Sequence, residues 1–155
     1  MHNKLTNCLL NDKIDCIQNK YNWMEIVNKE RGIEMIRNRL IILSARGDID
    51  AVRVLLDIGA DVNRVDENGV SALQAASANG HREIVRLLLD AGADINHVNR
   101  DGISALQIAS VYGHREIVRL LLDNGADVNH MDRNRVTALQ IASANRRVRE
   151  DRGLR

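Results

Sequence analysis

The amino-acid sequence predicts an all-α solenoid, built from helix-turn-helix units that are joined by hairpin loops. The prediction depends on two tripeptides that recur every 33 residues: Gly-Ala-Asp at 59–61, 92–94 and 125–127, and Ala-Leu-Gln at 72–74, 105–107 and 138–140. When residues 68–100 are aligned with residues 101–133, 24 of the 33 positions are identical. A repeat of this length is typical of units that stack and bury their apolar faces against each other.

Each complete unit is predicted to hold two helices, as residues 68–100 illustrate. Ser71 follows an Asn-Gly turn and precedes a run of helix-forming residues, so it is the expected N-cap of the first helix. Gly80 ends that short helix, and a second helix begins near Arg82 and stops at Gly92. The second helix has too many apolar positions for one stripe, which indicates packing on more than one side. An extended segment then leads to the next turn.

These units resemble the ankyrin repeat, whose pattern contains Asp-Gly-x-Thr-Pro-Leu-His, then Ile-Val-x-Leu-Leu-Leu, then Gly-Ala-Asp-Val-Asn. In the second complete unit these three places hold residues 101–107, 117–122 and 125–129. The resemblance covers residues 36–145 and implies an ankyrin-repeat solenoid. Two departures recur in three units: alanine replaces the motif proline at Ala72, Ala105 and Ala138, and glutamine replaces the motif histidine at Gln74, Gln107 and Gln140. Because glutamine donates and accepts hydrogen bonds, the turn network is expected to survive in altered form.

The resemblance divides the chain into segments of unequal completeness. They are, in order, an N-terminal helical segment at 1–35, a repeat without the turn motif at 36–67, complete repeats at 68–100 and 101–133, a partial repeat at 134–145 and an Arg-rich tail at 146–155. The N-terminal segment is either a degenerate repeat or an unrelated helical cap. All lysines lie before residue 30 and all arginines lie after it, which supports a boundary there.

The last unit departs most from the pattern. Arg135 stands where the complete units have glycine, so its turn is expected to be strained or reshaped. Its first helix is expected to end near Asn145, after which the motif of the second helix is missing. Either Leu139 and Ile141 then pack on a partner, or the end frays, which is the outcome we expect. Alternatively, the chain is a piece of a longer array.

Composition and charge exclude several classes of protein. The 22 basic and 21 acidic residues give a net charge of +1, which lacks the strongly basic footprint of a nucleic-acid-binding protein. The longest apolar run, 40–43, is too short to span a membrane, and no signal peptide is seen. Cys8 and Cys16 suit a reducing compartment and are expected to be small buried hydrophobes. A cytoplasmic protein is therefore expected.

No arrangement of residues in the sequence predicts catalysis, a metal site or a cofactor. Phosphate-binding glycine loops, His-Glu-x-x-His and Cys-x-x-Cys are all missing. Histidines recur one repeat apart, His81 with His114 and His97 with His130, and such stacked neighbours do not converge on one ion. We expect a structural role for the first pair and an exposed position for the second. The protein is therefore not expected to be an enzyme or to take a small-molecule substrate.

The family resemblance implies a protein partner, which binds the hairpin tips and the exposed side of the first helices. The tip positions are Glu67, Asn68 and Val70, then Arg100, Asp101 and Ile103, then Arg133, Asn134 and Val136. The helix positions are Ala78 and Asn79, then Val111 and Tyr112, then Ala144 and Asn145. Tyr112 is the only aromatic residue in the repeat region, and tyrosine is a favoured interface anchor.

The expected function is a non-catalytic protein-interaction module that acts as an adaptor, inhibitor or targeting protein. Two alternatives stay open. The chain is a structural fragment of a larger multi-repeat receptor or channel, or it is a regulator that contacts nucleic acid through the Arg-rich tail, although a basic run without interleaved aromatic residues is a weak signal. The sequence also resembles the substrate pattern of an asparaginyl hydroxylase that acts on ankyrin repeats, at three residues that also define the hairpins: Asn63, Asn96 and Asn129.

Overall fold

A computed structural model of the chain describes residues 38–151. This part holds seven helices, and its only β-pairing is two isolated bridges. The helices are α4 (Arg39–Arg46), α5 (Ile49–Asp57), α6 (Ala72–Ala78), α7 (Arg82–Asp90), α8 (Ala105–Tyr112), α9 (Arg115–Asp123) and α10 (Ala138–Asp151). The expectations for residues 1–35, including those for Cys8 and Cys16, lie outside the described residues.

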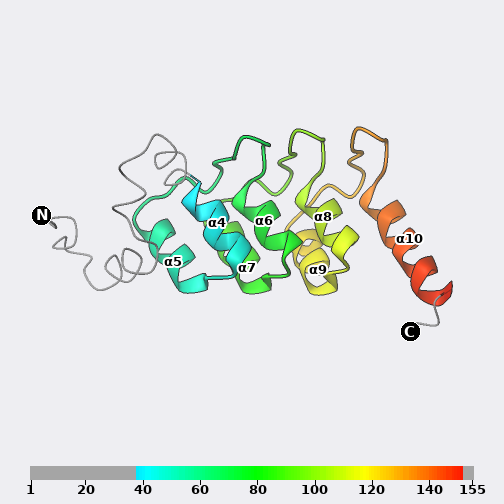
Figure 1. Ribbon diagram of the computed structural model, residues 1–155, viewed down its shortest axis with the longest axis horizontal. Coiled ribbons are helices and arrows are strands. Elements are labelled where there is room, and N and C mark those ends of the chain that lie inside the picture. The colour runs from blue at the N-terminus through cyan, green and yellow to red at the C-terminus, as the bar shows by residue number, and fades with distance from the viewer. Residues whose placement is uncertain (1–37, 152–155) are drawn as a thin grey trace, which may run out of the picture.

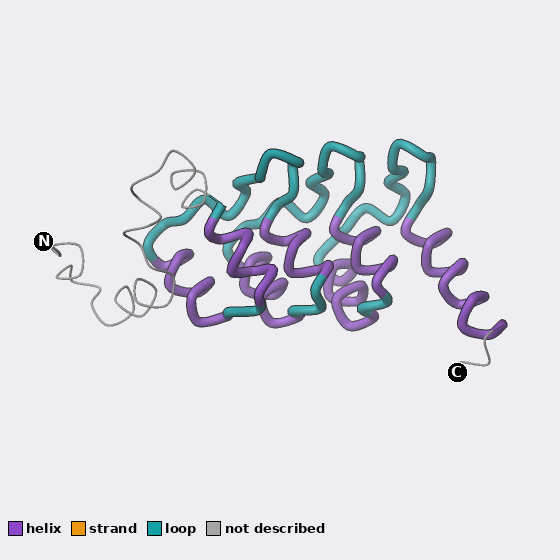
Figure 2. Tube along the Cα trace, viewed as in Figure 1, coloured by secondary structure: helices purple, strands orange, loops and turns teal. Residues whose placement is uncertain are grey.

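The helices stack in two rows (Figure 1). The first helix of each unit lies in one row, which runs α4, α6, α8, α10, and the second helices α5, α7 and α9 lie in the other. The hairpin loops all project from the same edge, next to the N-terminal ends of the first helices (Figure 2). The expected all-α solenoid of helix-turn-helix units with hairpin loops is therefore confirmed. No helix within residues 38–151 is long and apolar enough to cross a membrane.

The core is a series of thin aliphatic layers. Alanines on the first helices, such as Ala76 and Ala109, are fully buried and let neighbouring units approach closely. Larger side chains on the second helices, such as Ile84, Leu88 and Leu121, fill the remaining space. Because each layer is thin, aliphatic side chains reach the density of a protein interior without bulky rings. This explains how a chain without phenylalanine forms a core.

The glutamines that replace the motif histidine join each unit to the next. The Ser71 N–H donates to Gln74 Oε1 at 3.1 Å while the Gln74 N–H donates to the Ser71 hydroxyl, which forms a capping box. The Nε2 of Gln74 also donates to the carbonyl of Ile103 in the following unit at 2.7 Å. Gln107 repeats this arrangement and donates to the carbonyl of Val136 at 2.6 Å. The expected survival of the turn network in altered form is confirmed.

The turn of the last unit holds the strained residue that the sequence predicts. Arg135 has a φ of 62°, and it is the one non-glycine residue with positive φ among residues 38–151. Gly69 and Gly102 occupy the same place with a φ of 75°. A Cβ added at Gly69 would lie 3.1 Å from the backbone nitrogen of Arg100 in the next hairpin. Within the described residues no hairpin follows Arg135, so a side chain fits there although the backbone is strained.

The last helix is longer than the sequence predicts. The expected end near Asn145 is wrong, because α10 continues to Asp151. In the preceding unit the helix stops at Gly113, a C-cap residue with a φ of 72°, and Arg146 stands in that place in the last unit. Residues with a side chain disfavour this left-handed conformation, so no turn interrupts the helix there. Residues 146–151 of the predicted tail are therefore helical.

Candidate partner-binding surfaces

The outer tips of the three hairpins form a continuous row along one edge of the stack (Figure 2). Backbone hydrogen bonds connect them, since the Arg100 N–H donates to the Asn68 carbonyl at 3.0 Å and the Arg133 N–H to the Asp101 carbonyl at 3.5 Å. Six of the predicted tip residues are exposed: Glu67, Asn68, Arg100, Asp101, Arg133 and Asn134. We call these six residues the tip row. It contains acidic and basic side chains on hairpins that recur every 33 residues.

The three apolar tip positions are less accessible than the tip row. Val70, Ile103 and Val136 are all half-buried. The N–H of Val70 donates to the carboxylate of Asp66 at 2.9 Å, and that of Val136 donates to the carboxylate of Asp132 at 3.0 Å. The N–H of Ile103 donates to the side-chain amide oxygen of Asn99 at 3.0 Å. Their backbones therefore close the hairpins, and their side chains offer a partner less surface than the tip row does.

The predicted positions at the ends of the first helices lie away from the tips. A first helix of eight residues separates the two regions by roughly 12 Å along its axis. In α8, Val111 is 51% exposed and Tyr112 is 62% exposed, whereas Ala78 at the end of α6 is half-buried. The ring of Tyr112 stacks on that of His114, with centroids 6.2 Å apart and planes 26° apart. This contact limits the orientation of the Tyr112 ring although the side chain is exposed to solvent.

The other two units have asparagine in the place of this tyrosine. Asn79 is exposed, and its Nδ2 donates to the Ala75 carbonyl of its own helix at 2.9 Å. Asn145 is half-buried, and its Nδ2 donates to the carbonyls of Ser110 and Val111 in α8 at 2.7 and 3.1 Å. Asn145 therefore joins α10 to α8, unlike its neighbour Ala144, which is exposed.

Two of the histidines hold the ends of the first helices. The Nε2 of His81 lies 3.0 Å from the carbonyl oxygen of Ala45, and the Nε2 of His114 lies 3.0 Å from that of Ala78. Each ring thus bonds a carbonyl at the end of the preceding first helix. The expected structural role of this pair is confirmed.

The other two histidines also join adjacent units. Their expected exposure is wrong, because His97 and His130 are half-buried. The Nε2 of each ring lies 2.7 Å from a turn carbonyl in the preceding unit, that of Gly69 or of Gly102. Among residues 38–151 no three His, Cys, Asp or Glu side chains are grouped so that they could hold a metal ion.

The three hairpin asparagines have different surroundings. The Oδ1 of Asn63 accepts the N–H of Asp94 at 2.7 Å, and the Oδ1 of Asn96 accepts the N–H of Asp127 at 2.8 Å. Both bonds reach the following unit. The partial unit that follows Asn129 has no Gly-Ala-Asp segment within the described residues, and the backbone N–H of Asn129 donates to the Asp127 carboxylate at 2.9 Å. The side chain of Asn129 therefore lacks the bond to a next unit that fixes the other two.

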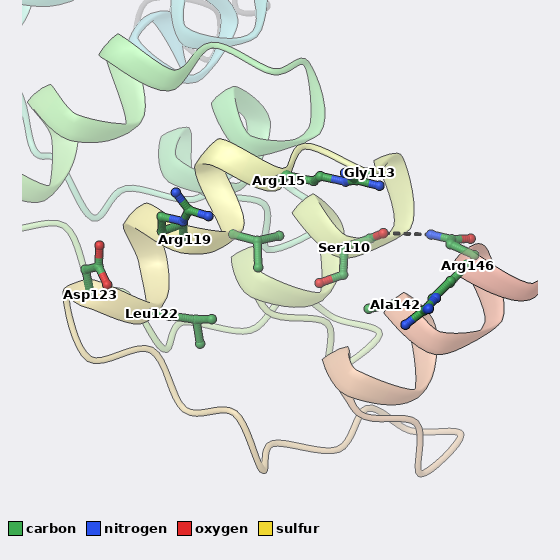
Figure 3. A pocket seen from close by; sticks show the side chains of 10 residues that line it. Ser110, Gly113, Arg115, Arg119, Leu122, Asp123, Ala142 and Arg146 are labelled. Carbon is green, nitrogen blue, oxygen red and sulfur yellow. Dashed lines mark hydrogen bonds between the residues drawn. The ribbon is translucent and has the colours of Figure 1, made fainter. Parts of the chain in front are cut away.

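A groove lies between α9 and α10 at the C-terminal end of the described stack (Figure 3). Its volume is about 460 Å³. We call it the terminal groove, and six of the residues that line it carry its chemistry: Arg115, Val118, Arg119 and Leu122 from α9, and Ala142 and Arg146 from α10. This groove was not predicted from the sequence. The signal that could have located it is the missing motif for a second helix in the last unit.

The outer side of α10 is also open. Leu139 is 73% exposed, whereas Leu106 at the same place in α8 is 2% exposed. Ser143, one turn further along α10, is likewise exposed, although the equivalent Ser110 in α8 is buried. The difference arises because α10 covers α8, while no helix within residues 38–151 covers α10.

One comparison with known families gives a match. A family model described as ankyrin repeats (3 copies) matches residues 3–99, 40–132 and 91–150. A comparison with curated proteins gives no match.

Proposed function

The chain belongs to the ankyrin-repeat family, and on that basis we propose that it binds a protein partner, as a non-catalytic adaptor, inhibitor or targeting module. Ankyrin repeats are generally protein-interaction modules, and fold alone does not name the partner. The tip row and the exposed ends of the first helices are the proposed binding surface. We further propose a cytoplasmic location, in which Cys8 and Cys16 stay reduced.

The observation that carries this proposal is the position of Tyr112. It is the one Phe, Tyr or Trp within residues 36–145, it is 62% exposed, and its ring rests against that of His114. A supported tyrosine offers a large contact area with few rotatable bonds to fix on binding, which is why tyrosine is enriched at the centres of interfaces. The neighbouring units have asparagine there, so the aromatic side chain marks one layer of an otherwise uniform stack.

The tip row complements this anchor with polar groups. Its charged members are Glu67, Arg100, Asp101 and Arg133, which alternate in sign along the edge. Exposed charges of this kind contribute to specificity and association rate more than to affinity. The proposed surface therefore combines an apolar anchor on α8 with a polar edge that selects the partner.

Affinity capture with the full chain as bait, followed by binding assays on the captured protein, tests the proposal. The double variant Tyr112→Ala/Arg100→Ala is expected to weaken binding at least about tenfold, which corresponds to roughly 1.4 kcal/mol. Arg86→Ala, an exposed position on α7 outside the proposed surface, is the matched control. Unchanged binding of the double variant would reject this surface. Salt-dependent retention of the chain on DNA, without a protein partner, would instead favour the nucleic-acid alternative.

We also propose Asn129 as the hairpin asparagine most accessible to an asparaginyl hydroxylase. Its side chain lacks the bond to a following unit that Asn63 and Asn96 make, so less structure has to open to expose it. Mass analysis of the chain purified from native cells, with the modified residue located by fragmentation, is the test. Absence of added oxygen on all three residues would remove this proposal.

A further inference from the structure

Two helices of identical sequence differ in how well they are covered. Both α7 and α9 read Arg-Glu-Ile-Val-Arg-Leu-Leu-Leu-Asp. Val85 in α7 is fully buried, whereas the equivalent Val118 in α9 is half-buried. Leu89 in α7 is half-buried, whereas the equivalent Leu122 is 42% exposed. Because the residues are the same, the difference comes only from what lies next to each helix.

The cause is a position in the second row of helices that no helix of residues 38–151 fills. α9 packs beside α7, but no helix within residues 38–151 packs on the next side of α9 (Figure 1). The terminal groove occupies this position, between the exposed side of α9 and the inner side of α10 (Figure 3). In the preceding layers a nine-residue second helix fills the equivalent place. In the other layers the element at this place is therefore a short second helix.

The chemistry of the groove indicates what kind of helix it accepts. Val118, Leu122 and Ala142 provide an apolar floor, and arginines line the groove at positions 115, 119 and 146. Asp123 is the one acidic residue among those that line the groove, whereas Arg115 and Arg119 on α9 are both exposed. An amphipathic helix binds such a groove by its apolar stripe. Acidic residues beside that stripe would complement the arginines.

We propose that the terminal groove binds an acidic amphipathic helix of a partner protein. The helix lies antiparallel to α10, in the place of a second helix of the last unit, with its apolar stripe on Val118 and Leu122. Its carboxylates lie near Arg115 and Arg119. This site is separate from the surface formed by the tip row and Tyr112, and it does not depend on that proposal.

Charge argues for a partner protein rather than a second copy of this chain. A two-fold contact through the terminal groove would bring Arg115, Arg119 and Arg146 of one copy toward the same residues of the other. Like charges at such short range disfavour the contact. An acidic partner helix meets the same residues with opposite charge.

A synthetic peptide tests the proposal on the full chain. The probe is an alanine-based helix of about 14 residues, roughly 21 Å long, with leucines spaced i, i+3, i+4, i+7 and glutamates on both flanks of that stripe. A scrambled peptide of the same composition is the first control. Fluorescence anisotropy measures the affinity of each peptide for the native chain and for three variants: Leu122→Glu, Arg119→Glu and Arg86→Glu.

We expect the amphipathic peptide to bind the native chain and the scrambled peptide to bind at least about tenfold more weakly. Leu122→Glu and Arg119→Glu should each weaken binding by about tenfold. Arg86→Glu, the same exposed position in the identical helix α7, should leave binding within a factor of about two, because α7 has no such groove. Circular dichroism of Arg119→Glu and Arg86→Glu should match, which shows that both variants fold.

Three results would overturn the proposal. The first is no binding of the amphipathic peptide at about 1 mM. The second is equal weakening by Arg119→Glu and Arg86→Glu, which indicates a general charge effect. The third is a concentration-dependent dimer of the native chain that Leu122→Glu disperses, which assigns the groove to a second copy.

Discussion

The helices α7 and α9 have the same nine residues but different environments. Neighbouring second helices lie on both sides of α7, whereas within the described residues α9 has one only on the α7 side. In α7 the shared sequence forms core, and in α9 part of it forms the wall of a groove. The comparison shows that in a stacked repeat the local sequence defines the helix, while position in the stack decides whether its apolar residues stabilise the fold or remain available for binding.

Substitution of the glutamines is expected to give the largest difference in the free energy of unfolding between an interior unit and the terminal unit. Gln107 is buried and bonds both the Ser104 N–H and the Val136 carbonyl, whereas Gln140 is exposed and bonds within its own cap. Gln107→Ala leaves the buried Ser104 N–H and the half-buried Val136 carbonyl without this partner, so it should lower the free energy of unfolding by about 2 kcal/mol. Gln140→Ala should lower it by less than about 1 kcal/mol. Urea unfolding of both variants measures the difference, and equal losses would contradict the assigned role of Gln107.

A smaller difference is expected for the valines of the identical helices. Val85→Ala removes two fully buried methyl groups and leaves a cavity, which should lower the free energy of unfolding by about 2 kcal/mol. Val118→Ala, at a half-buried position beside the groove, should lower it by about 1 kcal/mol or less. Thermal or urea unfolding of the pair provides the measurement. A larger loss for Val118→Ala would show that the groove is filled in the native chain.

The turn of the last unit offers a stabilising change. Arg135→Gly removes the strain of a non-glycine residue at a φ of 62° and should raise the free energy of unfolding by up to about 1 kcal/mol. Gly102→Arg, the reverse change in the preceding unit, should lower it, because it places a side chain on a backbone with a φ of 75°. Stabilisation by both substitutions, or by neither, would argue against strain at Arg135.

The smallest difference in the free energy of unfolding is expected between substitutions of two asparagines, Asn145 and Asn79. Asn145→Ala removes the bonds from α10 to the Ser110 and Val111 carbonyls and should lower the free energy of unfolding by about 1 kcal/mol. Asn79→Ala removes a bond from an exposed side chain to a carbonyl of its own helix, α6, and should lower the free energy of unfolding by about half as much or less. The melting temperatures of the two variants give the comparison. A larger effect of Asn79→Ala would show that Asn145 does not attach α10 to α8.

Much of this fold follows from the sequence because its determinants are local. Ser71 and Gln74 form their cap from residues three apart, and the recurrence of Gly-Ala-Asp fixes the period of the stack. The strained turn at Arg135 was predictable because glycine occupies that place in the other units. These features can be predicted without knowing how neighbouring units pack on each other.

The features that the sequence did not reveal depend on contacts between units. His97 was expected to be exposed as a hairpin residue, yet its ring bonds the Gly69 carbonyl, which lies 28 positions away. The helix α10 continues past residue 145 because Arg146 stands where Gly113 ends α8. The predicted end of the helix was based only on the missing motif of the second helix and not on the missing C-cap glycine. The terminal groove is the joint product of α9 and α10. Fraying of the end of α10 stays a prediction.

Hydrogen exchange in α7 and α9 compares the two helices without any substitution. Their identical sequences minimise differences in intrinsic exchange rate, so differences in protection report on local stability. Amide protons of residues 117–122 should exchange at least about tenfold faster than those of residues 84–89, and the acidic amphipathic peptide should slow the exchange of the first group. Equal protection of the two helices in the free chain would contradict the conclusion that, among residues 38–151, α9 has a neighbouring second helix on one side only.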